Sequence, residues 1–167
     1  MRVCILGSGL SSLALAKSLV NQKIYVDVLF SKKFYSANKT RTIGISKSNL
    51  QFFNDKIINI EKIVHKLNQI EIYSDNLKKE KLINFGNNHD YLFSIVKNYK
   101  LQEIIEKNLF SNKYFKKINH KKKINYLSDY DLIFNSDYNH PITKKYFSKK
   151  IEKKYNSIAY TTILKHE

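Results

Sequence analysis

The chain has 167 residues, a length typical of one domain or of part of a larger one. Its hydrophobic fraction of 43% is enough to bury a sizeable core, which excludes a globally disordered chain. A single cysteine excludes a disulfide framework, and the five histidines occur without a C-x-x-C or H-E-x-x-H motif, so we predict no metal site.

The net charge is +16, from 30 basic and 14 acidic residues. All basic residues except Arg2 and Arg41 are lysines, whereas arginine is preferred for two-point contacts with phosphates and guanines. Asn, Ile, Tyr and Phe are also abundant, which is the bias of an A/T-rich coding sequence. The composition therefore indicates that the lysine excess comes from drift of the coding sequence toward A and T rather than from selection for a polyanion-binding surface. Nucleic acid is not the partner we expect, and a basic module that binds RNA or anionic surfaces is the alternative.

The N-terminus imitates a signal peptide, with Arg2, an apolar stretch and Ala14-Leu15-Ala16. Glycines and serines interrupt that stretch, however, and the helical pattern continues past the supposed cleavage site to Val20. No run approaches the roughly 18 apolar residues of a membrane span. We therefore expect folded structure here and a cytoplasmic protein.

The first 30 residues predict a βαβ unit. Val3–Leu6 is a continuous apolar run, typical of a strand buried on both faces, and Cys4 within it is expected to be an inert apolar side chain. Gly7-Ser8-Gly9 ends this strand, and apolar residues at helical spacing follow over positions 10–20. The β-branched and aromatic run Ile24–Phe30 predicts the second strand.

Later segments predict both helices and strands. The predicted helices are a short one capped by Ser46 and reaching Phe53, a second over 57–67, a long one that opens at Asn98, and a fourth over 142–155 with lysine pairs on its outer face. The predicted strands are 69–73 and 81–85, both half-buried, then 130–134, buried, and finally 157–164.

The sequence Gly7-x-Gly9-x-x-Ser12 stands between a strand and a helix, where a dinucleotide fingerprint would stand. The first glycine permits a tight turn, the second lets a pyrophosphate approach the backbone, and a small third residue lets the helix pack on the strand. The acidic residue expected at the end of the second strand is absent, because Phe30 and Ser31 occupy that place. The alternative is a glycine turn that only joins strand to helix.

Six segments resemble, in the same order, those of a known family. They are CILGSGLSSLALA within Val3–Ala16, Arg41–Ser46, Ile70–Ser74, Ile95–Leu101, the D-L-I-F-N-S-D run of Asp131–Asp137, and Thr161–Glu167. Together they resemble the flavin-dependent aromatic-ring hydroxylases, in the branch that hydroxylates ubiquinone precursors. The resemblance implies that FAD is the cofactor, that NAD(P)H reduces it, and that the substrate is a small aromatic or quinone-precursor molecule.

The resemblance also implies the residues that contact FAD. Arg41 and Asn98 would lie beside the cofactor, with Arg41 along its flavin side, and Asp137 would support its ribityl and pyrophosphate region. The pyrophosphate turn would consist of Gly7, Gly9, Leu10, Ser11 and Ser12. No catalytic acid or base is implied, since the flavin carries the chemistry.

The implied fold is α/β: a Rossmann-like FAD-binding βαβ core with part of an added substrate-side sheet, truncated relative to the family. We expect one incomplete FAD-binding domain over 1–167, with 1–45 and 95–150 as the nucleotide-binding core and 68–93 and 155–167 as substrate-side strands. The family's later G-D-A-x-H motif is absent. The resemblance therefore implies that a C-terminal half or a partner chain completes the enzyme and that residues 1–167 alone are inactive.

Three alternatives stay open. The chain could be a flavoprotein of this fold that only oxidises or reduces, a decayed or split gene product without activity, or the basic binding module named above. Peripheral contact with the inner face of a membrane is a further expectation, because quinone precursors reside in lipid. The lysines at 113, 116, 117 and 121–123 lie among aromatic residues and could bind single-stranded nucleic acid, but a solvated edge is the interpretation we prefer.

Overall fold

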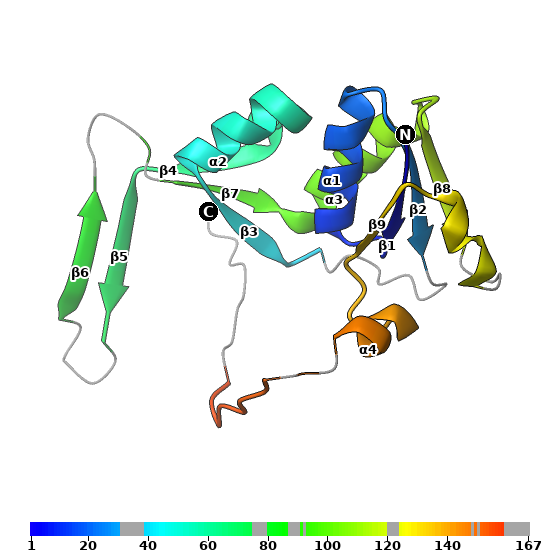
Figure 1. The fold of residues 1–167 in the computed structure, drawn as a ribbon. Coiled ribbons are helices and arrows are strands. Elements are labelled where there is room, and N and C mark those ends of the chain that lie inside the picture. The colour runs from blue at the N-terminus through cyan, green and yellow to red at the C-terminus, as the bar shows by residue number, and fades with distance from the viewer. Residues whose placement is uncertain are drawn as a thin grey trace. The chain divides into compact units, whose positions relative to one another are not determined.

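The structure is a computed structural model, and it describes residues 1–30, 39–74, 80–86, 91, 93–119, 124–147, 149 and 151–158. The chain forms two compact units (Figure 1). The first combines Met1–Ser36 with Asn108–Glu167, and the second is Ala37–Lys107.

A four-stranded sheet in the order β8-β2-β1-β9 forms the centre of the first unit, and every neighbouring pair in it is parallel. This unit confirms the predicted α/β class with a parallel sheet. Its strands are β1 (Arg2–Leu6), β2 (Tyr25–Phe30), β8 (Phe115–Asn119) and β9 (Leu132–Asn135), and its helices are α1 (Leu10–Asn21), the 3-10 helix η3 (Ile124–Asp129) and α4 (Pro141–Tyr146).

Both faces of this sheet are covered near β1, as its continuous apolar run predicts. The four residues of Val3–Leu6 are at most 1% exposed. Helix α1 lies beside β1 and β2 (Figure 1), and the buried side chains of this helix include Leu13, Ala16 and Val20. A second cluster forms around Cys4, Leu6 and Leu29, with Ile118, Leu127, Tyr130 and Ile142 packed against it.

Cys4 is fully buried, and this burial, helped by the negative charge of Asp27, raises the pKa of its thiol to about 12. Because the thiolate is the reactive form, we expect the native chain to react with a thiol reagent at pH 8 at least about a thousandfold more slowly than the unfolded chain. A colorimetric disulfide reagent in buffer and in denaturant measures both rates. Similar rates would contradict the buried position.

An ion pair and hydrogen bonds join β1, β2 and the segment just before β9. Asp27, whose side chain is 4% exposed, accepts hydrogen bonds from Arg2 Nη2 at 2.6 Å and from the Tyr130 hydroxyl at 2.7 Å. The Arg2 backbone also bonds to Asp131. The hydrogen bond from Arg2 to Asp27 and the attraction of the Asp27 carboxylate raise the pKa of Arg2. Burial, followed by the hydrogen bond that the Tyr130 hydroxyl donates to Asp27, raises the pKa of Tyr130.

We expect Tyr130→Phe to lower the free energy of unfolding by about 1.5 kcal/mol, because the buried Asp27 loses one donor while the aromatic ring stays. Urea unfolding followed by circular dichroism measures the change. Tyr155→Phe is the matched control, since Tyr155 is 72% exposed. Loss of its hydroxyl should change the free energy of unfolding by less than about 0.5 kcal/mol. Equal effects from the two variants would contradict the role of the hydroxyl.

The second unit contains antiparallel strands. A three-stranded sheet has the order β3-β7-β4, and β5 and β6 form a separate two-stranded ribbon (Figure 1). The strands are β3 (Thr42–Ser46), β4 (Val64–Leu67), β5 (Gln69–Tyr73), β6 (Lys81–Gly86) and β7 (Phe93–Lys97); the helices are α2 (Lys47–Phe52), the π-helix η1 (Phe53–Ile57), the 3-10 helix η2 (Glu61–Ile63) and α3 (Asn98–Phe110), whose last residues belong to the first unit. Ser46 caps α2 as predicted, because its Oγ accepts a hydrogen bond from the Asn49 N–H at 3.2 Å.

The predicted helix over 57–67 is wrong. The π-helix η1 ends at Ile57, and β4 pairs with β7 from Val64 to Leu67. Asn54 Oδ1 accepts a hydrogen bond from the Ile60 N–H at 2.9 Å, and Asn59 Oδ1 accepts one from the Glu61 N–H at 3.0 Å. These side chains supply the backbone with partners outside a helix, and the β-branched residues that follow favour an extended strand.

The predicted helix over 142–155 is also too long, since α4 ends at Tyr146. Three apolar side chains of the predicted helix face are exposed in the described part of the chain: Phe147, Ile151 and Tyr155 are 69%, 101% and 72% exposed. A short amphipathic helix without tertiary contacts is not stable in water. Of the strand predicted over 157–164, residues 157–158 are not in a strand, and the remainder, like residues 161–167 of the resemblance, lies outside the described residues.

Two burial predictions need correction as well. The sequence predicts a buried strand here, yet Leu132 and Ile133 of β9 are 45% and 36% exposed, because β9 is the edge strand of the described sheet and has β1 as its neighbour there. Strand β6 was expected to be half-buried, but all six of its residues are exposed in the two-stranded ribbon. Among the residues that the structure describes, no helix has the length and apolar character needed to cross a membrane.

Candidate functional site

The turn after β1 lies at the carboxyl end of the parallel sheet. Gly7 has φ +110°, a conformation that strongly favours glycine, and its N–H donates to Leu29 O on β2 at 2.8 Å. A Cβ at Gly7 would lie 2.7 Å from Ser136 Oγ and 3.3 Å from the Asp137 nitrogen. The turn therefore brings the ends of β1 and β9 into direct contact, and the sequence-predicted residues Gly7 and Asp137 are neighbours.

Helix α1 begins directly after Gly9, its N-cap residue, with φ −71° and ψ 173°. Gly9 is exposed, and a Cβ at this position would meet no described atom within 4 Å. The N–H groups of Leu10, Ser11 and Ser12 have no acceptor within the helix, because they belong to its first turn. This turn, which is described in full, contains no acidic side chain. The open helix end thus offers donors and the positive end of a 12-residue helix dipole, a suitable environment for an anion.

Ser12 attaches α1 to the sheet. Its side chain is buried, with 1% exposure, and its Oγ lies 2.5 Å from Ser136 Oγ. Ser136 Oγ in turn donates to Leu6 O at 3.0 Å. A larger residue at position 12 would separate the helix from these strand ends, so Ser12 allows the close packing that the third fingerprint position requires.

The segment after β9 is a well-connected turn around Asp137. Its N–H donates to Asn135 Oδ1 at 3.1 Å, and its Oδ1 accepts from the Asn139 N–H at 3.0 Å. Its carbonyl accepts from Thr143 Oγ1 at 3.0 Å. These bonds hold the backbone of Asp137 against Gly7. The next residue, Tyr138, is 64% exposed.

Arg41 and Asn98 belong to the second unit, and the structure brings them together. The Asn98 N–H donates to Arg41 O at 3.0 Å, next to the pairing of Thr42 with Lys97 in the β3–β7 ladder. Asn98 Oδ1 is buried and has no hydrogen-bond partner among the described residues, and the same holds for Ser94 Oγ. A buried polar atom without a partner is costly in a folded protein, so the unpaired oxygen of Asn98 makes this side chain a candidate for contact with a ligand.

The sequence places Lys117 in a lysine-rich, solvated edge, and it does not show that this residue lies beside the end of β2. Its Nζ is 5.0 Å from the centre of the Phe30 ring and 5.5 Å from that of Phe110. The contact of Lys117 with Phe30 depends on the pairing of β8 with β2, in which Lys117 lies opposite Val28 and Asn119 lies opposite Phe30. The sequence Phe115–Asn119 alternates too weakly to be recognised as a strand, and only the register places this lysine.

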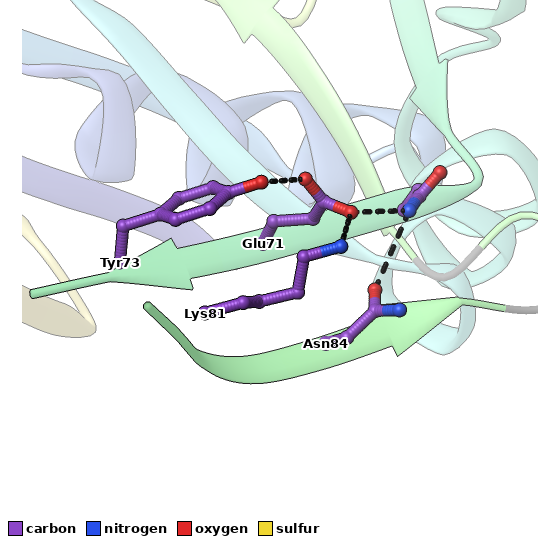
Figure 2. Close-up of polar contacts among 5 residues, drawn as sticks. Glu71, Tyr73, Lys81 and Asn84 are labelled. Atoms are coloured by element: carbon purple, nitrogen blue, oxygen red, sulfur yellow. Dashed lines mark hydrogen bonds and ion pairs between the residues drawn. The ribbon is translucent and has the colours of Figure 1, made fainter. Parts of the chain in front are cut away.

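The β5–β6 ribbon carries a polar network on one face (Figure 2). Glu71 accepts hydrogen bonds from Tyr73 at 2.5 Å, from Gln69 at 2.7 Å and from Lys81, with which it forms an ion pair. The bonds to Lys81 and Tyr73 lower the pKa of Glu71, and the bond to Glu71 raises the pKa of both partners. Glu71 therefore stays ionised and is unsuited to act as a general acid.

Among the described residues, no group of three or more His, Cys, Asp or Glu side chains could hold a metal ion. No protein-family model matches the sequence, and no curated protein matches it.

Solved structures with a similar fold include FAD-dependent monooxygenases. A probable FAD-dependent monooxygenase from Pseudomonas aeruginosa, pqsL, matches 93% of this chain at a TM-score of 0.67 and 12% identity, over 48% of its own length. A putative FAD-containing monooxygenase from Photorhabdus luminescens matches 89% at 0.59 and 17% identity, over 42% of its length.

The p-nitrophenol 4-monooxygenase PnpA from Pseudomonas putida matches 70% of the chain at a TM-score of 0.59 and 15% identity, over 31% of its length. At these identities the likeness concerns the fold. The chain spans less than half the length of each of these three proteins.

Proposed function

We propose that residues 1–167 are the N-terminal, FAD-binding part of a flavin-dependent monooxygenase that hydroxylates an aromatic ring, with a ubiquinone precursor as the substrate class. The observation that carries the proposal is the N-terminus of α1, which follows Gly7 and Gly9 at the carboxyl edge of a parallel sheet and has no described atom close to a Cβ at Gly9. Ligands of open α/β sheets bind at this edge. The likeness to FAD-dependent monooxygenases supports FAD as the dinucleotide.

The residues at the helix end fit a pyrophosphate. Gly9 leaves space above the first turn, the N–H groups of Leu10, Ser11 and Ser12 are donors, and a phosphate would meet no carboxylate on that turn. The strand order of the first unit, third-second-first-fourth by appearance in the chain, agrees with the first four strands of the classic dinucleotide-binding order and supports a Rossmann-like core. Asp137, held against Gly7, would lie beside the ribityl and pyrophosphate region.

Arg41 is the proposed contact along the flavin side, and Asn98 is a further proposed contact with FAD. Asn98 carries a buried side-chain oxygen without a partner among the described residues, and Arg41 is exposed beside it in the same unit. Bound FAD would supply the redox chemistry that inserts an oxygen atom from O2 into the ring, with NAD(P)H as the proposed reductant. The residues of this chain would bind and orient the cofactor, and none is proposed as a catalytic acid or base.

The hydroxylase activity is proposed for the whole protein, because the neighbours are more than twice as long as their matched regions. A C-terminal part or a partner chain would contribute the remaining substrate-side strands. We further propose a cytoplasmic location, with peripheral membrane contact as the route to a lipid-borne substrate.

The test is a fluorescence titration of the 167-residue chain with FAD and, as the comparison, with riboflavin, which lacks the pyrophosphate and the adenosine. We expect saturable FAD binding at least about a hundredfold tighter than riboflavin binding, because two or more charge-assisted bonds to the pyrophosphate are lost in riboflavin. No saturable binding of FAD, or equal affinity for both flavins, would refute the proposal.

A further inference from the structure

The end of β2 is the position at which dinucleotide-binding folds hold the adenosine ribose with a carboxylate. In this chain the last residue of β2 is Phe30, an aromatic residue that is half-buried. A charged residue also lies at this strand end, and it is a cation: Lys117 Nζ lies 5.0 Å from the centre of the Phe30 ring. The site therefore has the opposite charge to the usual one.

The register of the sheet fixes which lysine takes this place. Lys116 and Lys117 are adjacent in β8, so their side chains leave opposite faces of the strand. Lys117 is half-buried and its Nζ lies near the rings of both Phe30 and Phe110, whereas Lys116 is exposed. Contact of an ammonium with aromatic rings favours a defined position over free rotation of the side chain.

We propose that Phe30 and Lys117 form the adenosine-end subsite of the dinucleotide site, in place of the missing carboxylate. The inference rests on the proposed function, since it assigns the other end of the same ligand. Phe30 offers an apolar ring to the adenosine, and the Lys117 ammonium donates to the ribose oxygens. An ammonium attracts phosphate where a carboxylate repels it, so the subsite also accepts an adenosine with a phosphate on its ribose.

The probes for this subsite are 5'-AMP and 2',5'-ADP, which is 5'-AMP with a second phosphate on the ribose, titrated directly into the chain by isothermal calorimetry. We expect the wild type to bind 2',5'-ADP about tenfold more tightly than 5'-AMP, because one charge-assisted contact is added. In Lys117→Met this preference should disappear, and FAD affinity should fall about tenfold. In Lys116→Met, which removes the same charge from the other face of β8, both quantities should stay within about twofold.

Equal binding of the two nucleotides by the wild type, the absence of binding by either, or identical behaviour of the two lysine variants would overturn the subsite. A different result would contradict the proposed function: a wild-type chain that does not bind FAD. If FAD binds but Lys117→Met retains the phosphate preference, only the adenosine-end inference fails. Thermal unfolding of both variants checks that each is folded before the titration.

Discussion

Gly9→Val is expected to lower the affinity for FAD by about a hundredfold or more, since its branched side chain would occupy the space through which a pyrophosphate reaches the first turn of α1. The backbone of Gly9 is extended, at φ −71° and ψ 173°, and valine adopts this conformation without strain. No described atom lies within 4 Å of a Cβ at this position. Loss of the glycine N-cap should cost no more than about 1 kcal/mol of stability.

Two further glycine variants sharpen this experiment. Gly9→Ala loses the same capping preference but adds only a methyl group, so its FAD affinity should lie between those of wild type and Gly9→Val. Gly86→Val places the same side chain in β6, where a Cβ makes ordinary contact with Gln69 at 3.9 Å, and should leave FAD affinity unchanged. FAD binding by Gly9→Val that equals the wild type would contradict a pyrophosphate at this helix end.

Gly7→Ala should have the contrasting effect, a loss of about 2–4 kcal/mol in the free energy of unfolding. Gly7 has φ +110°, where an alanine is strained, and the new Cβ would overlap Ser136 Oγ at 2.7 Å and crowd the Asp137 backbone. The ends of β1 and β9 would have to separate. Urea unfolding followed by circular dichroism measures the loss.

Gly9→Ala is the matched control for Gly7→Ala, because the same methyl group is added two residues away, where no described atom lies within 4 Å of it. Its stability should change by no more than about 1 kcal/mol. A similar loss in both variants would mean that any substitution in this turn is harmful, and the close approach of Gly7 to Ser136 would then not be its cause.

The first 30 residues are the part of the fold that the sequence predicts best. Val3–Leu6 has no polar residue, as expected for a strand covered on both faces, and the glycines mark where it ends. The periodicity of α1 then matches its buried side chains. Local pattern is sufficient here because each element is stabilised by a large apolar surface.

Local pattern fails where side chains act on the backbone or where pairing decides the structure. Asn54 and Asn59 direct their side-chain oxygens to nearby N–H groups, and β4 follows where apolar spacing suggested a helix. Strands β3, β7 and β8 were not predicted because they depend on partners distant in the sequence. Phe147, Ile151 and Tyr155 have helical spacing, but they are exposed and are not packed against other described residues as a helix face would be.

The candidate site shows the same division. The motif Gly7-x-Gly9-x-x-Ser12 is visible in the sequence, and its conformation at the helix end follows from strand, turn and helix alone. The contact of Ser12 with Ser136 joins residues 124 positions apart, and the place of Lys117 beside Phe30 depends on the β2–β8 register. Neither could be predicted without the parallel sheet.

The most direct test of a dinucleotide at the α1 N-terminus is an amide nitrogen–proton correlation spectrum recorded during a titration with FAD. Bound pyrophosphate should shift the amide signals of Gly9, Leu10, Ser11 and Ser12 most, because their N–H groups lie at the proposed contact, with Asp137 affected next. The amides of the β5–β6 ribbon should stay in place. Shifts concentrated in that ribbon, or no saturable shifts at the start of α1, would contradict FAD binding at this site.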